Sequence, residues 1–454
     1  MDEPNNPQTR PFLQKADFQT KYAIFLLYGF FFLDKLLVYI SLPFTTILLF
    51  DRRVFFDRVY SALTTPGPLS GVTWALLIST MFGIAEVAYG LLEGYGLTSA
   101  LEILVFNLCP WFLFFGIVAG MQRPWSVRNY IRFLAYFHAI EGPIYYLFLR
   151  HVSFKIGSTD VSFAPGTGSL ALLGLFCFEQ RLSRYWFPIL VCSFDTIAGE
   201  MRADWLGFGM AVVVWAIAAR QIKRVLTIAA ILIALLAIGF VTDVRIPGLP
   251  GRGGEISARD TVARALSGID PELAQQLSPG AMGYGAGTIA WRENWWRDIR
   301  GEVFKSPVTA IFGLGYGYPI GQLVPALRNV DIRSPHSVFH FTLANSGLLG
   351  FFLFVLLQMQ LLRVLWKTFK QTGQIFGLAC AIFAIENSMF GNFFEAPQRA
   401  IPTYILLGMC IGPLFLAATQ QSTSDDVRKG GRALIPLLHE PAKGWPTSPE
   451  SVIR

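Results

Sequence analysis

The sequence predicts an all-α integral membrane protein with about twelve transmembrane helices. Of its 454 residues, 53% are hydrophobic and only 15% are charged, whereas about a quarter are charged in an average soluble domain. The apolar residues come in runs of roughly 15–25, the length that spans a bilayer as a helix. The basic residues gather on alternate connecting segments, as in membrane proteins with a fixed orientation.

Runs of apolar residues define the candidate spans along the chain. They lie at about 21–33, 36–50, 69–90, 100–120, 130–149, 166–179, 185–200, 204–219, 225–242, 337–362, 374–394 and 401–418. The first two runs are short, and Asp34 and Lys35 can form a tight turn between them. The first twenty residues are polar, so we expect no cleavable signal peptide. Because backbone groups in lipid must be satisfied within each segment, we interpret each run as a helix.

The placement of Lys and Arg predicts the orientation. With a cytoplasmic N-terminus, the inner short segments hold 17 basic residues and the outer ones hold 5. The inner residues are Arg10, Lys15, Lys21, Arg52, Arg53, Arg58, Arg123, Arg128, Arg132, Arg181, Arg184, Arg220, Lys223, Arg224, Arg363, Lys367 and Lys370, and the outer ones are Lys35, Arg150, Lys155, Arg202 and Arg399. This bias predicts that both termini are cytoplasmic. The net charge of +7 therefore reflects topology, and we expect no nucleic acid partner.

Two segments stand apart from the spans. We divide the chain into a cytoplasmic N-terminal segment (1–20), transmembrane helices 1–9 (21–242), a periplasmic loop (243–335), transmembrane helices 10–12 (336–418) and a cytoplasmic tail (419–454). The loop begins rich in Gly and Pro, and amphipathic helices are expected near 255–267 and 287–305. The tail is polar with scattered charges and prolines, which predicts disorder.

The cysteines and histidines do not predict a metal site. All five cysteines lie within apolar runs, without the spacing of a metal site or a disulfide framework. His336 and His340 are one helical turn apart at the mouth of the tenth span. No intervening Glu or nearby Cys completes a zinc site around them. Each is instead either an interfacial histidine bonded to backbone or a neutral general base at the edge of a dry cavity.

The loop segment WRENWWRDIRGEVFKSP combines aromatic and basic residues. On a helix, Arg292, Trp295 and Trp296 share a face within one turn. The tryptophans either anchor the loop at the membrane surface or help to position a guanidinium for bidentate phosphate binding. The next segment, IFGLGYGYP, has alternating glycines that permit tight turns and close backbone approach. Their spacing does not fit a dinucleotide-binding motif.

Charged residues also lie at or within the spans, where charge is costly unless it is paired or functional. Asp195, Glu200, Arg202 and Asp204 crowd the outer turn before the eighth span. Further polar residues lie inside other spans or at their ends, namely Glu86, His138, Glu141, Glu386, Asn387, Asn392 and Glu395. This set fits a polar cavity that opens outward, and it also fits a transporter.

Taken in order, these elements resemble the O-antigen ligase and polymerase superfamily of bacterial envelope glycosyltransferases. In that family an outer-turn Arg precedes two spans and a long periplasmic loop. The loop carries R-x-x-x-W, then a Pro and G-x-G, then a His followed eleven residues later by a G-x-x-G. Here the corresponding residues are Arg202; Arg292 with Trp296; Pro307 with Gly313 and Gly315; and His336 with Gly347 and Gly350. The matched part runs from about 163 to 362, and Ser337 replaces the Asn that usually follows the His.

The resemblance implies a GT-C-like helical fold and a metal-independent glycan transfer without a cofactor. The donor would be a glycan on undecaprenyl diphosphate, at the outer face of the bacterial inner membrane. Arg202 and Arg292 would hold the diphosphate, and His336 would be the catalytic base. His340 is a rival base, although the distance to Gly347 favours His336. The supporting candidates are Trp296, Asp204, Arg297, Arg333 and His340.

Three functions remain open at this point. A ligase would move finished glycan onto lipid A-core, and the matched loop motifs favour this interpretation. A polymerase would move a growing chain onto a glycan repeat, in O-antigen or exopolysaccharide synthesis. A non-enzymatic transporter or lipid-linked glycan flippase would also suit many spans among membrane lipids. One large outer loop that carries the Arg and His residues argues against the transporter, because it makes the two sides of the protein unequal.

Overall fold

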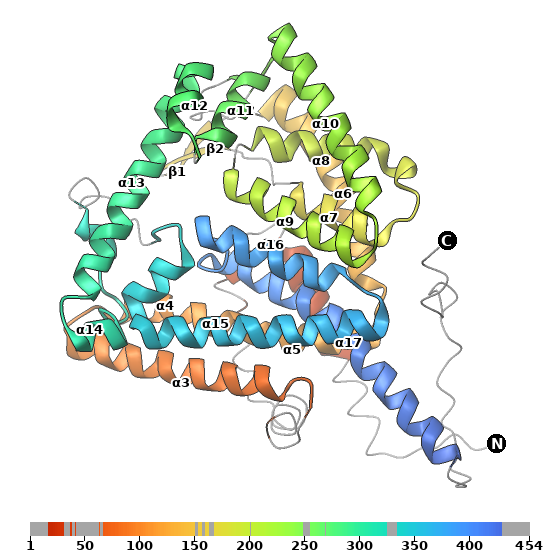
Figure 1. The fold of residues 1–454 in the computed structure, drawn as a ribbon. Helices are drawn as coiled ribbons and strands as arrows, with labels where there is room; N and C mark the ends of the chain where they lie inside the picture. The colour runs from red at the N-terminus through yellow and green to blue at the C-terminus, as the bar shows by residue number, and fades with distance from the viewer. Residues whose placement is uncertain are drawn as a thin grey trace.

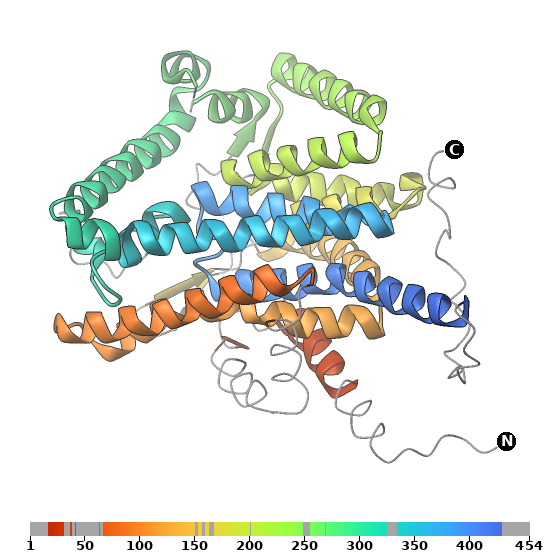
Figure 2. The same ribbon diagram turned by 60° about the horizontal axis from the view of Figure 1, so that its bottom comes forward.

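The part of the protein that the structure describes is built almost entirely from helices (Figures 1 and 2). The structure, a computed structural model, describes residues 17–30, 37, 38, 41, 63, 67–149, 153–156, 159–162, 168–199, 201–247, 255–267, 269–324 and 334–428. Within them, residues 17–30 are helical and a helix lies in each predicted span from 69–90 onward. The turn at Asp34 and Lys35 and most of the second predicted span lie outside the described residues.

The helices before the long loop follow one another with short connections. They are α3 (Ser70–Leu92), α4 (Leu97–Leu108), the 3₁₀ turn η2 (Cys109–Trp111), α5 (Phe112–Gln122), α6 (Ser126–Ile144), the π turn η3 (Tyr145–Leu149), α7 (Ser169–Phe178), the 3₁₀ turn η4 (Leu182–Tyr185), α8 (Trp186–Ala198), α9 (Arg202–Ala218) and α10 (Ile222–Thr242). One antiparallel hairpin, β1 (Ser153–Ile156) with β2 (Thr159–Ser162), interrupts them.

The loop and the C-terminal helices complete the chain. The elements are β3 (Arg245–Pro247), β4 (Glu255–Ser257), α11 (Ala258–Leu266), α12 (Pro271–Leu277), α13 (Pro279–Val303), α14 (Pro307–Phe312), the 3₁₀ turn η5 (Ile320–Leu323), α15 (Val338–Thr372), α16 (Phe376–Phe390) and α17 (Pro397–Arg428). The strands β3 and β4 pair antiparallel. Because α17 continues to Arg428, the predicted boundary at 419 falls inside a helix; residues 429–454 lie outside the described residues.

Several helices have the length and apolarity of membrane spans. Among the described residues, four segments meet both criteria, namely Ser70–Leu92, Leu97–Gln122, Ile222–Thr242 and Val338–Thr372. The helices α7 and α16 are apolar but shorter. Apolar helices in this number identify a multi-pass membrane protein. The count of twelve spans and their orientation stay predictions from the sequence.

In the core, α5 and α17 approach each other closely. Gly116 and Gly120 on α5 meet Gly408 and Gly412 on α17, so each helix presents a G-x-x-x-G stripe to the other. A Cβ at Gly116 would lie 2.1 Å from the Ile405 carbonyl oxygen. Small residues at such a crossing let two membrane helices approach to backbone contact. This pair anchors a core that is rich in Leu, Ile and Phe.

Ion pairs join segments that the basic-residue count assigns to the cytoplasmic side. Arg123, after α5, lies 3.4 Å from the Asp17 carboxylate. On α6, Arg128 and Arg132 share the Glu179 carboxylate at 2.9 and 2.7 Å, and each guanidinium donates two hydrogen bonds to it. Glu179, the residue that follows α7, thus binds two arginines of α6 at one end of the bundle. Asp17 contacts Arg123 near that end.

The long loop has its own small core. On α13, Trp295, Ile299 and Val303 follow the i, i+4 spacing of one helical face and are fully buried. They pack with Leu314, Ile320 and the start of α15, while α13 runs along one side of the molecule (Figure 1). Trp295 donates its indole N–H to the Ile320 carbonyl oxygen at 3.0 Å. Protein therefore surrounds Trp295, and its interpretation as a membrane anchor is wrong.

Candidate functional site

Four arginines and one histidine gather where the loop meets the predicted outer ends of α9 and α17. Arg202 opens α9, Arg264 lies on α11, Arg292 lies on α13 and Arg399 lies in the first turn of α17. The charges of Arg292 and Arg264 act on Arg202, and those of Arg292 and Arg399 act on His336. Segments more than a hundred residues apart thus build one positively charged site.

Arg202 is held by a hydrogen bond between its guanidinium and the end of α11. Its Nη1 donates a hydrogen bond to Ser267 Oγ at 2.5 Å, just after α11. Burial lowers the pKa of Arg202, and the neighbouring charges of Arg292 and Arg264 lower it further. The group nevertheless stays a cation, because an unperturbed Arg titrates above about 12. Bringing like charges together costs free energy, which a bound anion would recover.

Arg292 and Arg399 reach the site from two other helices. Arg292 Nη1 donates a hydrogen bond to the carbonyl oxygen of Phe390, the last residue of α16, at 3.1 Å. A guanidinium at a helix C-terminus satisfies a carbonyl that has no intrahelical partner. Arg399 is exposed, and no hydrogen bond or ion pair joins its side chain to another described residue. Its position suits binding of an anion from solution.

His336 occupies an unusual backbone conformation immediately before α15. Its φ of 53° lies in the left-handed region, which costs a non-glycine residue about 1–2 kcal/mol. The segment is held in place: Trp296 Nε1 donates to the Pro335 carbonyl oxygen at 2.9 Å, and the His336 N–H donates to Ser334 Oγ at 3.2 Å. Strained residues that their surroundings hold in place are frequent in active sites.

The His336 ring is neutral at physiological pH. Burial lowers its pKa to about 4, with further contributions from the charges of Arg292 and Arg399. Among the described residues none forms a hydrogen bond with this ring, and Trp291 lies with its ring centroid 6.5 Å away. A neutral imidazole has a free lone pair, so His336 can accept a proton from a bound hydroxyl.

The rival His340 is engaged on both ring nitrogens. Its Nε2 lies 2.9 Å from Arg300 Nη1, and its Nδ1 lies 3.0 Å from Ser337 Oγ. Because a guanidinium only donates, Nε2 is the acceptor and its lone pair is occupied. The ring also stacks on Trp296 at a centroid distance of 4.7 Å. These contacts favour His336 as the base and give His340 a supporting role beside it.

The glycine motifs have a backbone role. Gly347 divides α15 into two helical pieces, with φ 61° and ψ −162°, and Gly313 has φ 81° and ψ −164°. Both conformations are essentially restricted to glycine. The two glycines touch: a Cβ on Gly347 would lie 2.5 Å from the Gly313 nitrogen. Next to them, Leu314 N–H donates to the Ala344 carbonyl oxygen at 2.7 Å. The motifs therefore dock the loop onto the broken helix that follows His336.

Replacing Gly347 by alanine should destabilise this junction by more than about 2 kcal/mol, from backbone strain and the new clash. The added Cβ would lie 2.4 Å from the Ile311 carbonyl oxygen. Thermal unfolding of the detergent-purified protein would measure the loss. Gly301→Ala is the control, because a Cβ at that position on α13 would meet no neighbouring atom within 4 Å. Equal unfolding temperatures for both variants would contradict the docking role.

The other residues expected at the site are placed as follows. Trp296 stacks on His340 and donates a hydrogen bond to the Pro335 carbonyl oxygen. Asp204 is buried on α9 and accepts a hydrogen bond from the Asn387 side chain on α16. Arg297 is exposed and donates to Asn294 Oδ1 on its own helix at 2.8 Å, a contact that does not join it to the basic site. Arg333 lies outside the described residues.

The carboxylates expected together at the outer turn point to different partners. Asp195 is buried on α8 against α6, where a Cβ at Gly142 would lie 2.8 Å from its Oδ1. On α6, His138 Nδ1 lies 3.2 Å from Glu141 Oε2, so these two residues pair as polar groups inside a span are expected to. Glu200 lies outside the described residues. Of the described carboxylates, Asp195 and Asp204 therefore lie at contacts between helices, and Glu141 pairs within its own helix.

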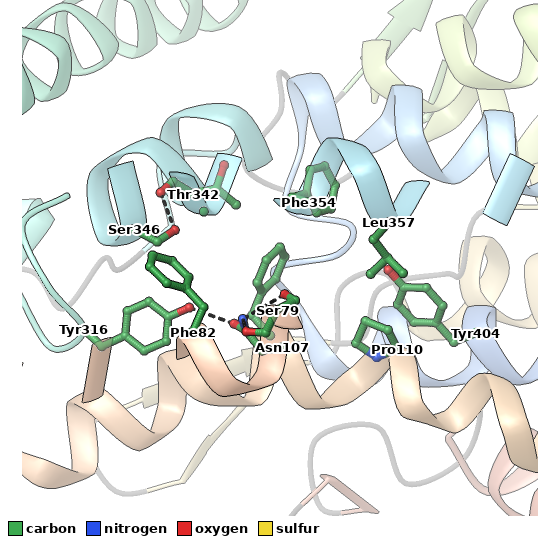
Figure 3. A pocket seen from close by; sticks show the side chains of 12 residues that line it. Ser79, Phe82, Asn107, Pro110, Tyr316, Thr342, Ser346, Phe354, Leu357 and Tyr404 are labelled. Atoms are coloured by element: carbon green, nitrogen blue, oxygen red, sulfur yellow. Dashed lines mark hydrogen bonds between the residues drawn. The ribbon is translucent and has the colours of Figure 1, made fainter. Parts of the chain in front are cut away.

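A separate pocket lies inside the bundle, beside the break in α15 (Figure 3). Its polar lining consists of Ser79, Asn107, Tyr316, Thr342, Ser346 and Tyr404. These groups largely bond to one another: the Tyr316 hydroxyl donates to Asn107 Oδ1 at 2.8 Å, and Asn107 Nδ2 donates to the Ser79 carbonyl oxygen at 2.8 Å. The pocket includes none of the basic residues, so we assign it to the support of the broken helix.

Three residues of this region are not identifiable as site residues from the sequence. Arg264 is one charge in a nearly balanced loop, so its convergence with Arg202 cannot be read from spacing. Arg399 carries a weak signal, as one of five basic residues on the predicted outer short segments. Glu395 is distinguished only as a polar residue at the end of a span. Each reaches the site through packing between distant segments.

The described residues contain no group of three or more His, Cys, Asp or Glu side chains arranged to hold a metal ion. The ligand chemistry of the site is that of guanidinium groups, which bind phosphate oxygens by charge-assisted hydrogen bonds.

Comparison with known proteins agrees with the motif order. Residues 187–355 match the family model described as O-antigen ligase. No curated protein gives a significant match to the chain. The matched region contains Arg202, Arg264, Arg292, His336 and the paired glycines, and the resemblance stated above is confirmed.

Proposed function

We propose that this multi-pass membrane protein is a ligase-like glycosyltransferase, because its residues 187–355 match the family model described as O-antigen ligase. It moves a glycan from undecaprenyl diphosphate to an acceptor hydroxyl at the periplasmic face of the bacterial inner membrane. The observation that carries the proposal is the convergence of Arg202, Arg292 and a neutral His336 on the predicted outer side. The acceptor is lipid A-core in the ligase reaction.

The diphosphate is the part of the donor that the arginines suit. Arg202 and Arg292, on different helices, lie close enough for their charges to interact, and Arg264 and Arg399 add positive charge around them. The two guanidiniums would bind one diphosphate together. Arginine presents a planar fork of donors that matches two phosphate oxygens. Its fixed charge stabilises the negative charge that grows on the leaving group as the bond breaks.

The acceptor hydroxyl is a poor nucleophile and needs a base. In the proposed step its oxygen attacks the anomeric carbon while the bond from that carbon to the diphosphate oxygen breaks. The electron pair leaves with the lipid diphosphate, and the hydroxyl proton passes to the His336 imidazole. Attack from the face opposite the diphosphate inverts the anomeric centre. The guanidiniums supply the electrophilic assistance, so the proposed reaction is metal-independent.

Deletion of the gene should leave lipid A-core without attached polymer, because the proposed enzyme performs that attachment. Gel analysis of the surface glycan measures this result, and a plasmid copy of the wild-type gene should restore the polymer. A single capped repeat on core would instead identify a polymerase with the same donor chemistry. Unchanged surface glycan, with unchanged exopolysaccharide, would contradict both enzymes.

A further inference from the structure

Glu395 connects the turn between α16 and α17 to the segment that carries His336. The Ser334 hydroxyl donates a hydrogen bond to Glu395 Oε2. The backbone N–H of Ser337 interacts favourably with the same carboxyl group. One side chain therefore holds the residue two positions before His336 and the residue directly after it. Glu395 lies outside the region that matches the family model.

The contacts of Glu395 act on the strained part of the backbone. Ser334 Oγ, which donates to Glu395, also accepts the His336 N–H at 3.2 Å. The chain of hydrogen bonds thus runs from the His336 backbone through Ser334 to the carboxyl group. A left-handed residue other than glycine persists only when its surroundings hold it. Trp296 on α13 donates a hydrogen bond to the Pro335 carbonyl oxygen, which holds the same segment from a second helix.

The charge state of Glu395 suits this task. Burial raises its pKa to about 8, while the hydrogen bonds from Ser334 and Ser337 lower it in part. At neutral pH the carboxyl group is therefore mostly protonated, and it adds no negative charge beside His336. Glutamine has the shape and the neutral charge of this protonated form, and its amide oxygen can accept the Ser334 hydroxyl.

We propose that Glu395 is a positioning residue for the transfer reaction, which fixes the left-handed conformation of His336 through Ser334 and Ser337. This inference rests on the proposed function, because it assumes that His336 acts on the acceptor. Glu395 touches neither the donor nor the reacting atoms. Its loss moves the base while the arginines that hold the donor stay in place. The expected defect is therefore in kcat rather than in the KM for the donor.

The test uses full-length protein in membranes with an undecaprenyl-diphosphate-linked glycan and purified acceptor. Glu395→Ala and Ser334→Ala should each lower kcat by about tenfold or more at an unchanged donor KM, since small displacements of a catalytic group cost up to about a hundredfold. Glu395→Gln should stay within about threefold of wild type. The double variant should lose no more than either single variant, because both act through one contact. Glu302→Gln is the matched control, since Glu302 on α13 pairs with Lys305 at 2.5 Å.

Wild-type kcat in Ser334→Ala and Glu395→Ala would overturn the inference, as would a loss that appears only in KM. If Glu395→Ala does not fold, Ser334→Ala and Glu395→Gln decide. A slow Ser334→Ala beside a fast Glu395→Gln supports the positioning role, and the reverse pattern overturns it. Absence of transfer by the wild-type protein would instead overturn the proposed function itself, and the positioning role with it.

Discussion

Replacing His336 by alanine is expected to lower the rate of glycan transfer by about 10²–10⁴-fold, the contribution of a positioned general base. The reason is that the acceptor hydroxyl then has no group to take its proton. Transfer from an undecaprenyl-diphosphate-linked glycan in purified membranes measures the rate. Donor binding should persist, because Arg202 and Arg292 remain.

His340→Ala provides the comparison for this experiment. The His340 ring accepts a hydrogen bond from Arg300 and stacks on Trp296. Its removal should therefore loosen the packing of these two side chains and cost less activity than removal of His336. A wild-type rate in His336→Ala would show that the assignment of the base is wrong. Full loss in His340→Ala with normal transfer in His336→Ala would move the base to His340.

The pH dependence follows from the depressed pKa of His336. Burial and the arginine charges disfavour the imidazolium, so the base form is present in the free protein at neutral pH and is lost as pH falls through about 4. The limb of kcat/KM that belongs to His336 should therefore lie near pH 4. A bound diphosphate offsets the charge of Arg292, which should raise the His336 pKa and shift the kcat limb to higher pH. Profiles of both parameters against pH check this order.

Replacing Arg292 by lysine should weaken binding of the lipid diphosphate by about tenfold to a hundredfold. Lysine keeps the positive charge but lacks the planar fork that bonds two phosphate oxygens, a difference of roughly 1.5–3 kcal/mol for a charged hydrogen bond. Competition of undecaprenyl diphosphate against the labelled donor measures the affinity. Arg363→Lys is the control, because Arg363 is an exposed residue on α15 in the predicted cytoplasmic part.

Unchanged donor affinity in Arg292→Lys, together with unchanged transfer, would remove Arg292 from the diphosphate site. If inorganic phosphate also bound more weakly to Arg292→Lys than to the wild-type protein, the result would point to a general anion site without selectivity for the lipid. The proposed role requires that Arg292→Lys binds the lipid diphosphate more weakly and that the folded variant is recovered in normal amount.

The helices themselves could be predicted from the sequence. A backbone in lipid has no water to bond with, so each apolar run must satisfy its own groups as a helix. That constraint is local, and a helix is found in each described span from 69–90 onward. The irregular features within these spans were not predicted, such as the 3₁₀ turn at Cys109–Trp111 and the extension of α15 to Thr372. They depend on packing with neighbouring helices.

The site was only partly determined by the sequence. Motif order predicted that Arg202, Arg292 and His336 lie on one side, because spans and loops alternate across the membrane. The distance to Gly347 already favoured His336 over His340, and the tertiary structure adds that Arg300 occupies the Nε2 lone pair of His340. Tertiary contacts also brought Arg264, Arg399 and Glu395 to the site. Spacing along a chain encodes which residues share a helix face, whereas contacts between distant helices depend on how those faces pack.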